Sequence, residues 1–110
     1  IMNKGEIWVI DFPSRSGKEQ TGTRPSIVMG DTGTNLALVI PLTSNLQALN
    51  KIPYTLRINK SKDNKLDKDS VALVLQLQTL DKKRFISKIS ILEKEHVDKI
   101  DKEIRRLLQL

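Results

Sequence analysis

The sequence predicts a mainly β domain with one C-terminal helix, in which short strands form a small, twisted, partly closed barrel and the helix packs on it. Two observations support this fold class. Short apolar segments separated by turn residues follow one another as far as Leu77, and after Ser90 the apolar residues take the spacing of a helix. Because no repeat or linker interrupts the 110 residues, we expect a single domain over residues 1–110.

The first strand is predicted over residues 5–12, GEIWVIDF. Ile7 and Val9 share one face and Trp8, Ile10 and Phe12 share the other, which is typical of a largely buried strand. Residues 13–23, PSRSGKEQTGT, are rich in Pro, Ser, Gly and Thr and are too long for a minimal hairpin turn. We interpret them as a mobile functional loop.

Four more segments continue the β pattern. RPSIVMG and NLALVIPLT predict two strands joined as a hairpin by residues 31–34, where Gly33 permits a positive φ. Residues 54–58 alternate, and the apolar run of residues 70–77 predicts a buried central strand. A polar, charged loop lies between them.

The last segment has helical spacing. One stripe collects apolar residues from the C-terminal part of the chain: Val97, Ile100, Ile104, Leu107 and Leu108. Residues 90–93, SILE, have the form of a capping box, so we expect the helix to begin there.

Composition narrows the function. Lysine and arginine number 19 against 13 acids, a net charge of +6, which suits a polyanionic partner and equally suits a lysine-rich solubility coat. The absence of cysteine excludes disulfides, a thiolate nucleophile and a cysteine metal cluster. No apolar run approaches the ~20 residues that span a bilayer, so we expect no membrane partner and a soluble, cytoplasmic protein.

The residue inventory also limits the chemistry. His96 is the single histidine, so a two-histidine nuclease is excluded, and we interpret His96 as an exposed helix residue. Asp63, Asp67, Asp69 and Asp81 are of the type that holds Mg²⁺, but lysines beside them favour a solvated loop. We therefore expect neither a metal nor another cofactor.

Arg24 and Thr43 are the candidate catalytic residues, because each lies where a predicted strand meets a loop. A guanidinium fork and a hydroxyl are suited to grip a phosphate. RNA brings its own nucleophile, the 2'-hydroxyl, and needs no metal for attack. The proton acceptor stays open, since arginine has an ordinary pKa above ~12. The alternative is local: Arg24 as a turn arginine and Thr43 as a hydroxyl bonded to its own backbone.

With these residues located, the chain resembles the MazF/PemK/Kid family of toxin endoribonucleases. Four segments match that family in order: GEIWVIDF, its opening strand; GTRPSIVM, its Gly-x-Arg-Pro strand; IPLTSN, its Pro-Leu-Thr-Ser segment; and DSVALVLQLQTLDKKRF, its Asp-Ser strand. The resemblance implies an SH3-like barrel with a C-terminal helix, of the kind shared with gyrase-poisoning toxins. It also implies a homodimer, metal-independent cleavage of single-stranded RNA at short sequences, and a cognate antitoxin.

The resemblance implies that Arg24 assists proton transfer and holds the phosphate. It implies that Thr43 binds the scissile phosphate. The remaining candidates are RNA-binding residues in the loop, after Thr43 and in a later strand: Arg15, Lys18, Gln20, Thr23, Ser44, Asn45, Gln76 and Gln78. Strand alternation places Gln76 and Gln78 on one face, opposite Leu75 and Leu77. A solvent-facing role explains these glutamines equally well.

The chain also departs from its relatives. Many of them carry Glu-Gln-Ile-Arg-Thr where this chain has LQLQT, so Gln78 replaces a usual arginine, which leaves the preferred RNA site open. Two rival functions remain: a gyrase poison of the same fold, and a barrel that binds nucleic acid without cleaving it. The gyrase poisons depend on a C-terminal Trp-Gly-Ile, whereas this chain ends in Leu-Leu-Gln-Leu.

Overall fold

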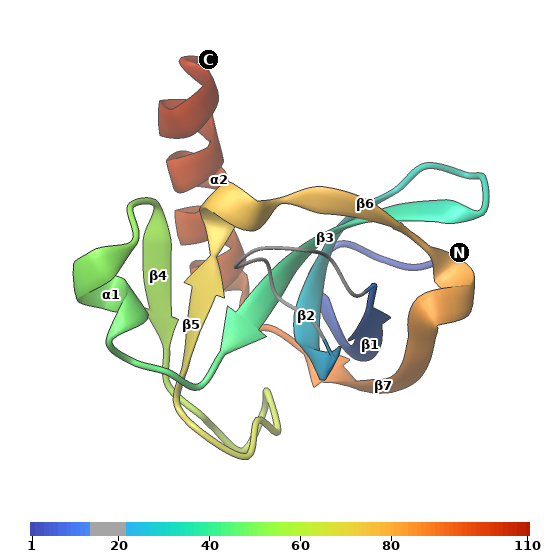
Figure 1. Cartoon of the computed structure of the whole chain (residues 1–110), viewed down its shortest axis with the longest axis horizontal. Helices are drawn as coiled ribbons and strands as arrows, with labels where there is room; N and C mark the ends of the chain where they lie inside the picture. The colour runs from blue at the N-terminus through green and yellow to red at the C-terminus, as the bar shows by residue number, and fades with distance from the viewer. Residues whose placement is uncertain (14–21) are drawn as a thin grey trace.

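The computed structural model describes residues 1–13 and 22–110 and confirms the predicted fold class (Figure 1). Seven strands, two α-helices and two 3₁₀ turns follow in the order β1 (Glu6–Phe12), β2 (Gly22–Asp31), β3 (Leu36–Thr43), α1 (Ala48–Lys51), β4 (Thr55–Ile58), β5 (Ser70–Leu73), η1 (Val74–Gln76), β6 (Gln78–Asp81), η2 (Lys82–Arg84), β7 (Phe85–Ile91) and α2 (Lys94–Leu108). The long predicted loop lies mostly outside the described residues.

The sheet has the strand order β4-β5-β3-β2-β1-β7, and all its pairings are antiparallel. The predicted hairpin of β2 and β3 is confirmed. Strand β3 is shared along its length: its first half pairs with β6 and its last two residues pair with β5. The C-terminal end of β3 therefore lies where the sheet changes partners, and this end carries Thr43.

The core lies on both faces of β1. Ile7 belongs to a large cluster that includes Ile27, Ile40 and Ile100 of α2, all fully buried. Ile10 belongs to a second, smaller cluster. The alternation in the sequence thus predicted a strand with both faces covered, and the structure confirms it.

The strand predicted over residues 70–77 is wrong in its second half. Strand β5 ends at Leu73, and the chain turns through η1 before β6 resumes at Gln78. At this turn the Val74 N–H donates to the carbonyl of Tyr54, at 3.0 Å. The apolar residues of this segment favour a strand by propensity. The strand is nevertheless interrupted, because β5 and β6 pair with different parts of β3.

The helix start predicted at residues 90–93 is also wrong. Ser90 belongs to β7, and α2 begins at Lys94 after Glu93 as its N-cap residue. The Ser90 hydroxyl donates to the carbonyl of Asn64 instead of capping a helix. The sequence analysis missed β6 and β7, although β7 pairs with β1 and so holds one edge of the sheet.

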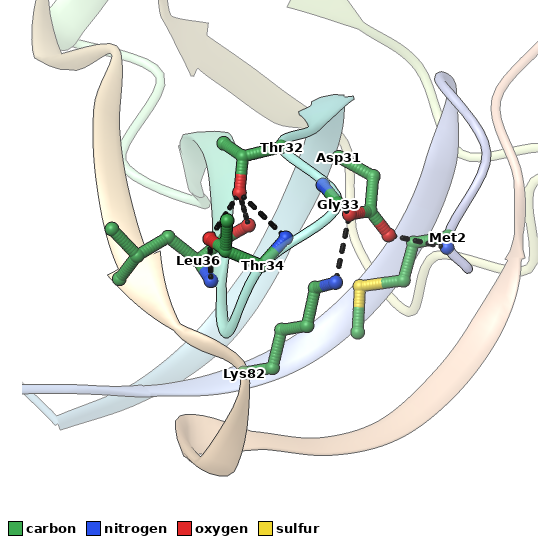
Figure 2. A network of polar contacts seen from close by, with 7 residues as sticks. All are labelled: Met2, Asp31, Thr32, Gly33, Thr34, Leu36 and Lys82. Atoms are coloured by element: carbon green, nitrogen blue, oxygen red, sulfur yellow. Dashed lines mark hydrogen bonds and ion pairs between the residues drawn. The ribbon is translucent and has the colours of Figure 1, made fainter.

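The turn between β2 and β3 is held by the carboxylate of Asp31 (Figure 2). It accepts hydrogen bonds from the Met2 N–H at 2.8 Å, the Gly33 N–H at 2.8 Å and the Lys82 Nζ at 2.7 Å. Gly33 has the predicted positive φ, 76°. The Lys82 bond is the largest influence that lowers the pKa of Asp31, so the chain's start, this hairpin and η2 meet at one ionised carboxylate.

Candidate functional site

The sheet register brings Arg24 and Thr43 to neighbouring strand ends. The ladder of β2 and β3 runs from Val28 opposite Val39 to Ser26 opposite Pro41, so Arg24 and Thr43 each lie two residues beyond its last pair. Pro25 and Pro41 lack the N–H donors that would extend the ladder. The two residues therefore lie at strand ends just beyond the ladder that β2 and β3 share.

A cleft of about 600 Å³ lies at these strand ends. Its wall combines the ends of β2 and β3, the connection between β4 and β5, and one residue each from β1, β5 and β7: Val9, Thr23, Arg24, Pro25, Leu42, Thr43, Ser44, Lys65, Leu66, Asp67, Lys68, Ser70 and Ile89. Within the described part of this wall the charged side chains are three cations and one carboxylate. The cleft is thus suited to an anion.

Arg24 is half-buried at the start of β2. Its Nη1 donates to the carbonyl of Leu42 at 3.5 Å, which orients the guanidinium toward the end of β3. Burial lowers the pKa of Arg24 below its ordinary value, because desolvation disfavours the charged form. A partly desolvated guanidinium binds a phosphate more strongly than one in bulk water.

Thr43 is half-buried at the end of β3, and its Oγ1 accepts a hydrogen bond from the Asn45 N–H at 3.1 Å. The local reading of Thr43, a hydroxyl that closes its own turn, is therefore confirmed. This bond occupies only the oxygen, so the hydroxyl can still donate its hydrogen. The turn fixes the side chain and keeps a donor for a ligand in the cleft.

The other predicted site residues divide into three groups. Thr23 and Ser44 line the cleft beside Arg24 and Thr43. Asn45 lies outside the lining, where its Oδ1 accepts from the Gln47 N–H at 3.1 Å. Three candidates fall outside the described residues: Arg15, Lys18 and Gln20.

Gln76 and Gln78 do not line this cleft. Their predicted alternation with Leu75 and Leu77 is wrong, because η1 replaces the strand there and leaves Leu75 46% exposed. The Gln78 Nε2 donates to the carbonyl of Gln76 at 3.0 Å, which joins the two locally.

The remaining titratable candidates are dispersed. His96 lies in the first turn of α2, half-buried rather than exposed as predicted, and outside the cleft. Asp69 pairs with Arg57 at 3.3 Å, and Asp81 accepts from the Lys83 N–H at 2.9 Å. Over residues 1–13 and 22–110, no three His, Cys, Asp or Glu side chains gather closely enough to hold a metal ion.

The sequence analysis missed three polar members of the cleft: Lys65, Asp67 and Lys68. Their interleaved charges were interpreted as a solvated loop, and each is exposed. The signal that could have located them is the single apolar residue among them, Leu66. A lone leucine in a charged loop indicates a segment tied to the core, and Leu66 is buried.

Fold and cleft together define a class: a small antiparallel β domain with a C-terminal helix and a basic cleft at its strand ends. Comparison with known proteins specifies the class further. The model of one family, described as the PemK-like, MazF-like toxin of type II toxin-antitoxin systems, matches residues 3–108. The chain belongs to this family, as its sequence predicted.

Individual relatives agree with this assignment. The chain is 35% identical over 104 residues to the endoribonuclease MazF of Staphylococcus epidermidis, a match that covers 92% of this chain and 86% of the relative. The crystal structure of MazF from Deinococcus radiodurans superposes with a TM-score of 0.81 at 20% identity, covering 100% and 98% of the two chains.

A mycobacterial endoribonuclease, solved in complex with its cognate antitoxin, superposes with a TM-score of 0.75 at 17% identity, covering 100% and 97%. At these identities the two solved structures show the fold alone. Among the described residues, none of the helices has the length and apolar character needed to cross a membrane.

Proposed function

We propose that this toxin is a metal-independent endoribonuclease that cleaves single-stranded RNA at short sequences. The observation that supports the proposal most directly is the shared cleft, in which the guanidinium of Arg24 and the hydroxyl of Thr43 lie at adjoining strand ends. The named relative of 35% identity is an endoribonuclease. Both facts favour phosphate chemistry over a structural role for the two side chains.

In the proposed reaction the 2'-hydroxyl of the RNA attacks the adjacent phosphorus. Arg24 binds the non-bridging oxygens, whose negative charge grows in the transition state, and assists proton transfer. Thr43 donates its hydrogen to the same phosphate. The products are a 2',3'-cyclic phosphate and a 5'-hydroxyl end, because the nucleophile belongs to the substrate.

The charge of the chain supports binding of a polyanion. The net charge of +6 is joined at the cleft by Arg24, Lys65 and Lys68. Thr23 and Ser44 add uncharged donors beside them. In the proposal these residues hold the RNA backbone, while Arg15, Lys18, Gln20, Asn45, Gln76 and Gln78 remain proposed contacts to flanking nucleotides.

We also propose two protein partners. The first is a cognate antitoxin, in line with the family's place in toxin-antitoxin pairs and with the mycobacterial relative solved with its antitoxin. The second is another copy of this chain. This second partner is proposed because the resemblance to the family implies a homodimer.

The proposal is tested by incubating the purified protein with a mixed-sequence RNA in the presence of EDTA. We expect cleavage into fragments with 2',3'-cyclic phosphate and 5'-hydroxyl ends, and mapping of the 5' ends gives the preferred sequence. RNA that stays intact, or fragments that carry 5'-phosphates, would contradict the proposal. A parallel assay of DNA supercoiling by gyrase detects the rival activity.

A further inference from the structure

The proposed reaction lacks one part, a group that accepts the proton of the 2'-hydroxyl. Arg24 is a poor acceptor, because even with its pKa lowered by burial a guanidinium holds its proton tightly. Thr43 and Ser44 are alcohols and accept no proton at neutral pH. We therefore expect the proton acceptor among the other residues of the cleft wall.

The connection between β4 and β5, residues 59–69, forms a second part of that wall. In Figure 1 it lies below the C-terminal end of β3, and it contributes Lys65, Asp67 and Lys68 to the cleft of Arg24. Among the described residues of the wall, Asp67 is the only carboxylate. It is thus the one described side chain there that offers a carboxylate oxygen to a proton.

The connection is held in place by a buried asparagine. Asn64 is fully buried, and its Oδ1 accepts from the Ser61 N–H and the Leu66 N–H, each at 3.0 Å. Its Nδ2 donates to the Asn59 carbonyl at 3.0 Å and to the Glu93 carboxylate at 3.1 Å. Such a satisfied polar network makes the loop a rigid element.

Of the residues after Asn64, Lys65 and Asp67 are exposed, whereas Leu66 between them is buried. Lys65 has a φ of 56°, a left-handed conformation that is uncommon for a side-chain-bearing residue. Leu66 enters the main core cluster, and Ser70 begins β5. Asp67 lines the cleft between these two anchored residues, so the backbone on both sides limits where its exposed carboxylate can lie.

We propose that Asp67 is the general base of the cleavage reaction, an inference that rests on the proposed function. The bond from the 2'-oxygen to phosphorus forms while the bond from phosphorus to the 5'-oxygen breaks. The 2'-hydroxyl proton passes to the Asp67 carboxylate, and water protonates the leaving 5'-oxygen. The resulting carboxylic acid returns its proton to solvent, and no oxidant, metal or second reactant is consumed.

The test compares two aspartates of the same loop. Asp67→Asn removes the proposed base, and Asp63→Asn makes the same charge change at an exposed residue that does not line the Arg24 cleft. We expect kcat of the first variant to fall about 10²- to 10⁴-fold, the range typical of a lost general base, and kcat of the second to stay near wild type. Asp67→Glu, which keeps a carboxylate, retains more activity than Asp67→Asn.

Two further readouts separate a base from a structural residue. Affinity for an RNA that carries a 2'-deoxynucleotide at the mapped cleavage position stays near wild type in Asp67→Asn. The pH profile of kcat is expected to change in Asp67→Asn, whereas loss of a purely structural residue would leave the profile unaltered. Equal rates in Asp67→Asn and Asp63→Asn would overturn the inference, whereas wild-type protein that leaves RNA intact overturns the proposed function itself.

Discussion

Arg24 and Thr43 each make a hydrogen bond to the backbone and still line the cleft. Arg24 reaches the Leu42 carbonyl, and Thr43 accepts from the Asn45 N–H. For Thr43 this is the local bond that the sequence left open, whereas Arg24 lies in β2 rather than in a turn and bonds across to β3. Both bonds orient groups that the proposed reaction uses. A side chain fixed in this way loses less conformational entropy when a ligand binds.

Sequence could locate these two residues because their positions follow from neighbouring strand patterns. The position of Asp67 at the cleft could not be predicted from the sequence, because it depends on the contact between Asn64 and Glu93, which are 29 residues apart in the chain. A charged loop in water and a charged loop that walls a cleft have the same composition. Only the contacts of the buried residues inside the loop tell them apart.

Asp31 gives a residue-scale prediction about stability. The folded state lowers its pKa below the ordinary 3.8, chiefly through Lys82, so the ionised carboxylate stabilises the fold above that pH. We expect Asp31→Asn to lower the free energy of unfolding by a constant amount between about pH 5 and 7. The difference from wild type shrinks as the pH falls below 3.8, where the unfolded chain takes up the proton.

Urea denaturation at several pH values measures this difference. Asp11→Asn is the matched control, since Asp11 is 56% exposed and lies 4.0 Å from its cationic partner Arg84. We expect little change in that variant at any pH. A destabilisation by Asp31→Asn that persists undiminished at pH 2 would show that the carboxylate's charge is not what stabilises this turn.

Among the elements, α2 shows where periodicity succeeds and where it fails. Val97, Ile100 and Ile104 of the predicted stripe pack in the main core cluster, as expected. Leu108 was predicted in the same stripe but is 56% exposed, so the prediction is wrong at that residue. The start of the helix was wrong because a Ser and a Glu three residues apart resemble a cap in any setting. Here both bind Asn64 instead, so they serve the loop between β4 and β5.

The packing of α2 supports a prediction at the element scale. Ile100 lies on the core-facing side of α2 and is fully buried. Ile100→Ala therefore leaves a cavity and is expected to lower the free energy of unfolding by about 2–5 kcal/mol. Leu108→Ala, on the same helix at a residue 56% exposed, is expected to change it by less than about 0.5 kcal/mol. Denaturant melts of both variants measure the two values. Equal effects would mean that α2 does not dock through this stripe.

At the scale of the whole molecule, the net positive charge could serve a polyanionic partner or solubility alone. The basic cleft favours a polyanionic partner. Lys65 and Lys68 line the same cleft as Arg24, which is distant from them in the sequence. Each cation that contacts a phosphate of single-stranded RNA contributes about −0.7 to the slope of log affinity against log salt. With three contacts we expect a slope near −2.

Lys65→Ala tests this expectation with an RNA made uncleavable by 2'-deoxy substitution. The salt slope is expected to become shallower by about 0.7. Lys62→Ala, on the same connection but outside the cleft lining, removes an equal charge and is expected to leave the slope nearly unchanged. Identical slopes in the two variants would mean that net charge, rather than this cleft, binds the RNA.

The central claim is that Arg24 and Thr43 act on one phosphate, and a double-mutant cycle on cleavage rate tests it most directly. Arg24→Ala and Thr43→Val are each expected to lower kcat at least about 100-fold while the protein stays folded. The double variant is expected to lose little more than the worse single variant, because groups that serve one transition state are strongly non-additive. Wild-type cleavage by Arg24→Ala, or losses that simply multiply in the double variant, would contradict the claim.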